Sequence, residues 1–244
     1  MSLTAVFLLA LMTAIATGLG ALPFLFVSGV ARRSLGSANA LAAGLMLAAS
    51  AVLLMEGTSA GAWLTAGGAL VGAAAVVLAQ RVLSQHESLS VGELSGADAR
   101  RAVLIMGVMT AHSFAEGIGV GVSYGGGDSL GLFVTTAIAL QNVPEGLAIA
   151  LVLVPSGVSV WAAAGWAVVS SLPQPVFALP AYAGVEAFTQ ALPFGLGFAA
   201  GAMVAMALVD LLPEAVEMAG WRRVALIAQG ALLAGLAVDV ALGL

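Results

Sequence analysis

The chain has 244 residues, of which 61% are hydrophobic and 8% charged, and its mean hydropathy is +1.12. Soluble domains carry about 25% charged residues, so this chain could not cover a water-facing surface and is predicted to be a polytopic membrane protein. The absence of cysteine excludes disulfides, thiolate metal sites and thiol catalysis. The formal net charge of −5 comes without the basic patches that bind nucleic acid, so no nucleic-acid partner is expected.

Apolar runs divide the chain into predicted membrane spans, each of which needs roughly 20 residues. The first run lacks a basic N-terminal region and is too long for a cleaved signal, so it is interpreted as a span. Only the connection over 81–101, rich in Ser, Gly and Glu, is long enough to be a real loop. The sequence predicts a single membrane domain over 1–244 with eight spans, at 4–30, 38–55, 60–80, 102–124, 129–154, 158–184, 190–212 and 223–243.

The basic residues predict the orientation of these spans. All of them are arginines, and they fall in the first, third and seventh connections: Arg32, Arg33, Arg81, Arg100, Arg101, Arg222 and Arg223. With eight spans, these three connections lie on one side of the membrane. Basic residues collect in cytoplasmic connections, so both termini are expected outside and the loop over 81–101 is expected inside.

Two of the runs contain polar residues close to their centres. His112 and Glu116 are four residues apart in "AHSFAEGIGVGVSY", and Gln141 and Glu145 have the same spacing in "ALQNVPEGLAIALVLV", so each pair shares one helix face. A charged carboxylate at the bilayer centre costs about 2.5–3.5 kcal/mol on the insertion scale. A divalent cation would offset this cost, since Glu and His are standard zinc ligands and carboxylates with amides also suit manganese or iron.

The surroundings of Glu145 favour an ion site but leave alternatives open. Pro144 and Gly146 bracket it, and a proline inside a membrane helix is tolerated where the helix lines a cavity or packs on protein. The His and Glu side chains could instead form a packing hydrogen bond without metal. A metal held there could also serve an intramembrane metal-dependent hydrolase, although the chain lacks H-E-x-x-H and G-x-S-x-G.

The motifs "H-S-F-A-E-G" and "Q-N-V-P-E-G" resemble the paired motifs of the ZIP (Zrt-, Irt-like) divalent metal transporter family, and the chain is most similar to its GufA-like bacterial branch. "TGLGALPFLF", "LPFGLGFAAGAMV" and "DLLPE" extend the resemblance over nearly the whole chain. The resemblance implies an all-α membrane protein with eight transmembrane helices in a 3+2+3 inverted-repeat bundle. It implies location in a bacterial cytoplasmic (inner) membrane, with the lipid bilayer as surroundings and a homodimer as a further expectation.

The resemblance also implies the activity. The chain would be a transporter and not an enzyme, and would move Zn-like cations, with Cd, Fe and Mn as further candidates, from outside into the cytoplasm by alternating access. The divalent metal, zinc first, is then the transported substrate, and no catalytic cofactor is expected.

Ligand positions follow from the same resemblance, residue by residue. The positions that hold the primary transported metal match His112, Glu116, Gln141 and Glu145. The positions of a second, adjacent metal site match Ser113, Asn142 and, in the seventh span, Val209 or Asp210, of which Asp210 would complete the site if its helix turns it inward.

The second site departs from the family pattern. Ser113 replaces an Asn, Asn142 replaces the Asp of some members, and Gln174 stands where relatives often have Glu; Ala115 stands in place of a proline. The second site has therefore lost much of its charge, and one bound metal per chain is expected. Glu214 is either an exit-path ligand or a solvated cap near the cytoplasmic end.

Overall fold

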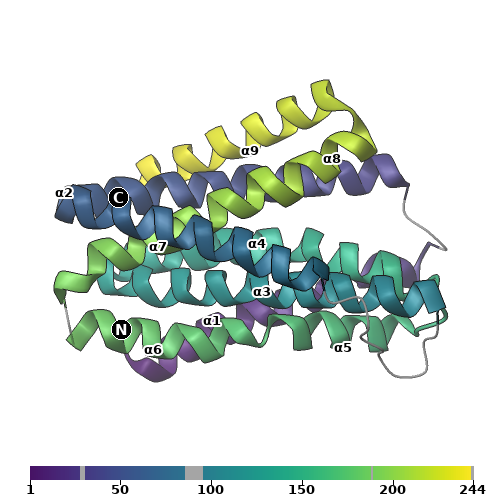
Figure 1. The fold of residues 1–244 in the computed structure, drawn as a ribbon, viewed down its shortest axis with the longest axis horizontal. Helices are drawn as coiled ribbons and strands as arrows, with labels where there is room; N and C mark the ends of the chain where they lie inside the picture. Colours follow the sequence, from purple (N-terminus) through teal and green to yellow (C-terminus); the bar gives the residue numbers. More distant parts are fainter. Residues whose placement is uncertain (28–30, 86–95, 188, 243–244) are drawn as a thin grey trace.

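The structure is a computed structural model that describes residues 1–27, 31–85, 96–187 and 189–242. Within these ranges the chain is helical and contains no strand, so the all-α prediction is confirmed (Figure 1). The elements in chain order are α1 (Leu3–Leu19), η1 (Leu22–Leu25), α2 (Arg32–Gln85), α3 (Gly96–Gly126), α4 (Asp128–Leu153), α5 (Val160–Ser171), α6 (Pro173–Ala187), η2 (Thr189–Ala191), α7 (Leu192–Met206), η3 (Ala207–Leu211), α8 (Leu212–Ala219) and α9 (Trp221–Leu242).

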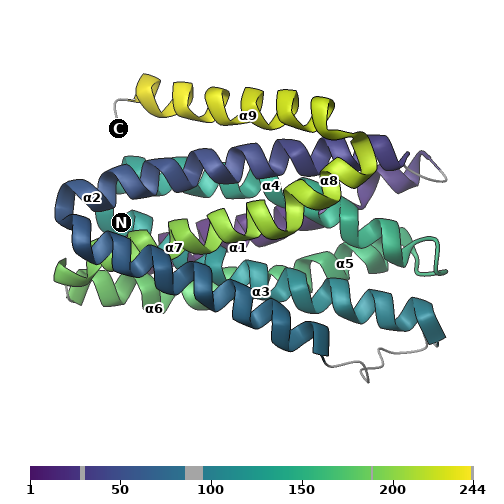
Figure 2. The same ribbon diagram turned by 45° about the horizontal axis from the view of Figure 1, so that its top comes forward.

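Helix α2 forms two arms, because its backbone leaves the helical conformation at Gly61, with φ 176° and ψ 88°. Figure 2 shows the chain running to one end of the molecule and returning from there. The second and third predicted spans, 38–55 and 60–80, lie on these two arms. The predicted loop over 81–101 includes residues 86–95, which lie outside the described part of the chain.

Six segments of the described chain are long and apolar enough to cross a membrane, which confirms a multi-pass membrane protein. They are Leu3–Leu25, Arg32–Ala79, Asp128–Leu153, Val160–Val185, Thr189–Ala219 and Trp221–Ala241. The fourth of these contains α5 and α6, which meet at Pro173 because a proline ring cannot continue the preceding helical hydrogen bonds. The fifth contains α7, the π-helical turn η3 and α8.

The helices pack as two groups. In the first, α1, α3, α4, α5 and α6 contact one another, and in the second, α2 contacts α7, α8 and α9. Small residues bring α2 and α7 together: a Cβ on Gly72 would overlap the carbonyl oxygen of Phe198, and one on Gly201 would overlap that of Ala69. Close approach through small residues is how membrane helices gain packing energy. Contacts of α2 with α4 and of α3 with α7 join the two groups.

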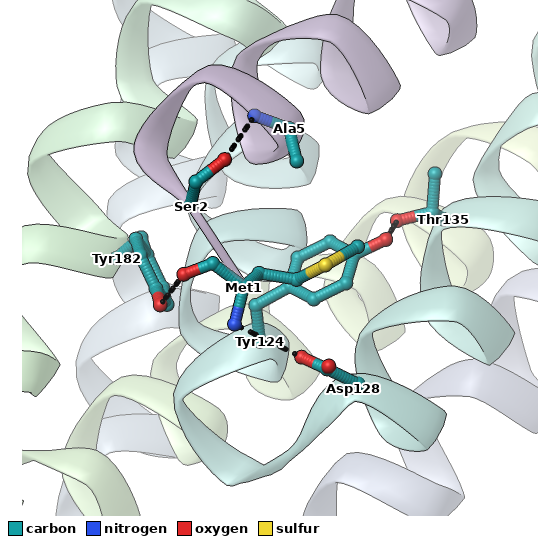
Figure 3. A network of polar contacts seen from close by, with 7 residues as sticks. All are labelled: Met1, Ser2, Ala5, Tyr124, Asp128, Thr135 and Tyr182. Atoms are coloured by element: carbon teal, nitrogen blue, oxygen red, sulfur yellow. Dashed lines mark hydrogen bonds and ion pairs between the residues drawn. The ribbon is translucent and has the colours of Figure 1, made fainter.

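Polar contacts at one end of the bundle tie the first group together (Figure 3). Ser2 caps α1 by accepting a backbone N–H of its first turn at 3.2 Å. Tyr182 of α6 donates its hydroxyl to the carbonyl oxygen of Met1 at 2.7 Å. On α3 and α4, the Thr135 hydroxyl donates to the Tyr124 hydroxyl at 3.2 Å. The Met1 amino group donates to Asp128 of α4 at 3.2 Å, so together these contacts link α1, α3, α4 and α6 near the chain's N-terminus.

The helices begin and end at two opposite ends of the bundle. The start of α2, the turn between α4 and α5, and the turn between α8 and α9 lie at one end in Figure 1, opposite both chain termini. The arginine pairs Arg32–Arg33 and Arg222–Arg223 fall at the first residues of α2 and α9, and so at that end. Arg32 forms an exposed ion pair with Glu217 of α8 at 2.9 Å.

Candidate metal site

The residues singled out on the fourth and fifth predicted spans lie in the protein interior, at mid-length of the packed helices α3 and α4. Each is at most 2% exposed: His112, Ser113, Glu116, Gln141, Asn142 and Glu145. Burial of two carboxylates and an imidazole is costly unless hydrogen bonds or a counter-charge compensate. Whether these groups can be charged in the interior therefore depends on their hydrogen-bond partners and on the neighbouring charges.

Each glutamate is followed by a glycine, and the structure shows why. A Cβ on Gly146 would overlap the carbonyl oxygen of Thr17 in α1, and a Cβ on Gly117 would lie 2.6 Å from the carbonyl oxygen of Gln174 in α6. The glycines thus let the backbones of α1 and α6 pass directly against the helices that carry Glu116 and Glu145. The E-G pairs place each carboxylate at a three-helix junction rather than at the lipid surface.

Glu116 accepts hydrogen bonds at both carboxylate oxygens. Gln141 Nε2 donates to Oε1, and Gln174 Nε2 donates to Oε2 at 2.7 Å. On its other side, Gln174 Oε1 accepts from the Thr13 hydroxyl and from Asn142 Nδ2 at 3.1 Å. Asn142 Nδ2 also donates to the backbone carbonyl of Thr13 at 2.7 Å. A continuous network therefore joins α1, α3, α4 and α6 around one carboxylate.

Several oxygen atoms of the cluster are buried and accept no hydrogen bond from the described residues: Ser113 Oγ, Gln141 Oε1, Asn142 Oδ1 and Glu145 Oε1. Leaving such an atom unsatisfied costs about 1–3 kcal/mol. Glu145 also lies close enough to Glu116 for their charges to repel. Carboxylate and amide oxygens with a nearby imidazole make a donor set that suits a divalent transition metal. The residues present thus fit a cation as ligand.

The side chains do not converge into a preformed cage. In the part of the chain that the structure describes, no three His, Asp or Glu residues gather closely enough to hold a metal by themselves. The carboxylate of Glu116 instead faces the side-chain amides of Gln141 and Gln174. Joint coordination by His112, Glu116 and Glu145 would require their side chains to turn toward one another.

The structure places Asp210 in a different environment from Ser113 and Asn142. It lies half-buried in the π-helical turn η3, which packs against α2. Its charge interacts with that of Glu214 on the next turn. Glu214 in turn accepts a hydrogen bond from Asn39 Nδ2 of α2 at 3.3 Å. Asn142, in contrast, lies within the Glu116 network.

Gln174 and Thr13 belong to the cluster but were not among the ligand candidates. Gln174 carries a detectable signal, because a polar residue between Pro173 and Pro175 inside an apolar run repeats the pattern around Glu145. Thr13 carries none, since a threonine in a membrane helix ordinarily bonds its own backbone, and the Thr13 hydroxyl does lie 2.7 Å from the Ala10 carbonyl oxygen.

A multi-pass helical bundle with buried and partly unsatisfied carboxylate, amide and imidazole groups is typical of membrane proteins that bind or move metal ions. Comparison with known proteins supports a narrower assignment. The family model described as ZIP Zinc transporter matches residues 83–242. The chain belongs to the ZIP zinc transporter family, which confirms the resemblance stated from its motifs.

Individual relatives agree with this membership. A candidate zinc transporter of Arabidopsis thaliana is 46% identical, with 92% of this chain and 36% of the relative covered. Zinc transporter GufA of Myxococcus xanthus is 34% identical over 84% of this chain and 85% of the relative. Zinc transporter ZIPB of Bordetella bronchiseptica is 36% identical over 82% and 69%. The chain thus spans about a third of the Arabidopsis protein, and all three are named as transporters rather than enzymes.

Proposed function

We propose that this chain transports divalent transition-metal cations, zinc first, from outside into the cytoplasm. One observation carries the proposal: two carboxylates, an imidazole and two amides are buried at mid-length of α3 and α4, in a family whose relatives are named zinc transporters. A structural hydrogen bond between one His and one Glu would need neither the second carboxylate nor the unsatisfied amide oxygens.

His112, Glu116, Gln141 and Glu145 are the proposed ligands of the transported cation. The charges of Glu116 and Glu145 would cancel those of a divalent cation, so the loaded cluster would be neutral within a low-dielectric interior. Ser113, Asn142 and Asp210 remain the candidates for a second cation. Because Ser113 and Asn142 are neutral, one cation per chain is proposed.

The proposed topology has eight crossings with both termini outside. The segment Arg32–Ala79 reverses at Gly61 and supplies two crossings, and α3 adds one to the remaining five segments. The order is then three crossings before α3, the pair α3 and α4, and three after, as the 3+2+3 arrangement of the family requires. The arginines at the starts of α2 and α9 support a cytoplasmic location for that end, and the bacterial inner membrane is the proposed location.

Alternating access would come from motion of the first helix group against the second. Within groups, glycine contacts reach backbone atoms, as between Gly146 and Thr17. Between groups, the glycines meet side chains instead: a Cβ on Gly119 of α3 would lie 3.3 Å from Met203 Cε of α7. Backbone contacts within a group support its movement as one unit, and side chains at the boundary can change rotamer as the groups move.

An open groove lies on the same boundary. Its volume is about 560 Å³, and its apolar walls come from α4 on one side and from α2 and α9 on the other. Along this groove α4 does not pack closely on α2 and α9, which supports movement at the boundary. Inward movement of a divalent cation would gain about 4.6 kcal/mol per 100 mV of membrane potential, from 2.3 per charge.

Metal flux into proteoliposomes tests the proposed function. Purified protein would be reconstituted and exposed to zinc, cadmium, manganese, iron and magnesium, with a pH gradient imposed or abolished. We expect uptake of zinc and cadmium well above protein-free vesicles. A protein that retains zinc through purification but moves none would contradict transport and would favour the intramembrane hydrolase.

A further inference from the structure

We infer that Gln174 is a positioning residue for cation binding, which holds the carboxylate of Glu116 through a hydrogen bond from its amide group. This inference rests on the proposed function, since it concerns the ligand Glu116. Gln174 is completely buried, and it contacts three other helices through one amide group. It acts through Glu116 and is not itself placed among the ligands.

The orientation of the Gln174 amide is determined by its neighbours. The backbone carbonyl of Thr13 can only accept, so the Asn142 group that faces it at 2.7 Å must be the NH₂. The same NH₂ faces Gln174 at 3.1 Å, so the atom of Gln174 at that position must be Oε1. Nε2 of Gln174 is therefore directed at Glu116 Oε2. A backbone atom of α1 thus fixes, through two amides, which group meets the carboxylate.

This arrangement has an electrostatic consequence for Glu116. Two amide N–H groups donate to its carboxylate without adding a positive charge, so they offset part of the cost of burying it and do not neutralise it. A carboxylate at position 174 would instead face Glu116 and the nearby Glu145 with a third negative charge. Such a cluster requires a proton or a second cation. The neutral Gln174 therefore holds Glu116 without adding to the repulsion between the carboxylates.

A matched control exists between α1 and the same predicted span, 158–184. Thr17 Oγ1 and Ser171 Oγ are buried and hydrogen-bonded at 2.8 Å, between α1 and the end of α5, close in sequence to Thr13 and Gln174. The substitution Ser171→Ala removes a buried polar contact between α1 and the sixth predicted span without changing any hydrogen bond to Glu116. This variant therefore measures how the loss of an interhelical hydrogen bond away from Glu116 changes the unfolding temperature and the zinc affinity.

Zinc titration of the purified full chain, followed by calorimetry and paired with thermal unfolding, tests the inference. We expect Gln174→Met to bind zinc about ten- to a hundred-fold more weakly, the range for losing one hydrogen bond to a charged group. Ser171→Ala should bind zinc like the wild type, even if both variants unfold at similarly lowered temperatures.

Other outcomes would overturn the inference. If Gln174→Met does not fold, Gln174→Asn replaces it in the experiment, since this variant keeps an amide on a shorter side chain. Gln174→Asn should still weaken zinc binding, whereas Ser171→Ala should not. Equal zinc affinity of the position 174 variants and Ser171→Ala would overturn the positioning role alone, provided Glu116→Ala abolishes binding. No zinc binding by the wild type would overturn the proposed function together with this inference.

Discussion

Gly146 of α4 and Thr17 of α1 lie in direct backbone contact, so close that a Cβ on Gly146 would overlap the Thr17 carbonyl oxygen. This contact seats Glu145, the preceding residue, against α1. We predict that Gly146→Ala forces the two helices apart and destabilises the protein by about 1–3 kcal/mol, the usual range for overpacking. Thermal unfolding in detergent would measure the loss.

A glycine in open space provides the control for this prediction. A Cβ on Gly165 of α5 meets no atom within 4 Å, so Gly165→Ala should leave stability unchanged or slightly raised. If Gly146→Ala were as stable as Gly165→Ala, the close contact between α1 and α4 would be wrong.

Substitutions of the proposed ligands should differ in effect from one outside the cluster. Glu145→Ala and His112→Ala each remove a ligand, so zinc uptake into proteoliposomes should fall to near background. Glu214→Ala should be milder, because Glu214 lies beside Asn39 and Asp210 rather than in the Glu116 network. Normal uptake by His112→Ala would contradict the proposed primary site.

The orientation can be measured with single cysteines, because the chain has none of its own. Ser34 and Ser129 are both exposed and lie in the first turns of α2 and α4. A membrane-impermeant thiol reagent added to intact cells should label Ser129→Cys but not Ser34→Cys. The opposite pattern would invert the proposed topology.

Sequence reasoning reached the helical class and the cluster on α3 and α4, because composition and i,i+4 spacing carry that information locally. It also predicted a break between the spans 38–55 and 60–80, and the backbone of α2 leaves the helical conformation there, at Gly61. It noted Gln174 only as a departure from the family pattern. Its partners Thr13 and Asn142 lie 161 and 32 residues away, and only packing brings them together.

Position 210 illustrates the same limit. Its side-chain direction depends on the π-helical turn over Ala207–Leu211, which shifts the register of the helix by part of a turn. The Leu-rich sequence of that segment gives no signal for such a turn, so the direction of Asp210 could not be inferred from spacing.

Anomalous scattering at the zinc edge from crystals soaked in zinc tests the central claim most directly, since it locates the cation itself. We predict one full-occupancy peak per chain between α3 and α4, within ligand distance of His112, Glu116, Gln141 and Glu145, and an additional peak beside it in Asn142→Asp. Two full peaks in the wild type about 4 Å apart, the separation of paired-metal sites, would contradict the single-cation site, and a peak remote from α3 and α4 would contradict the site altogether.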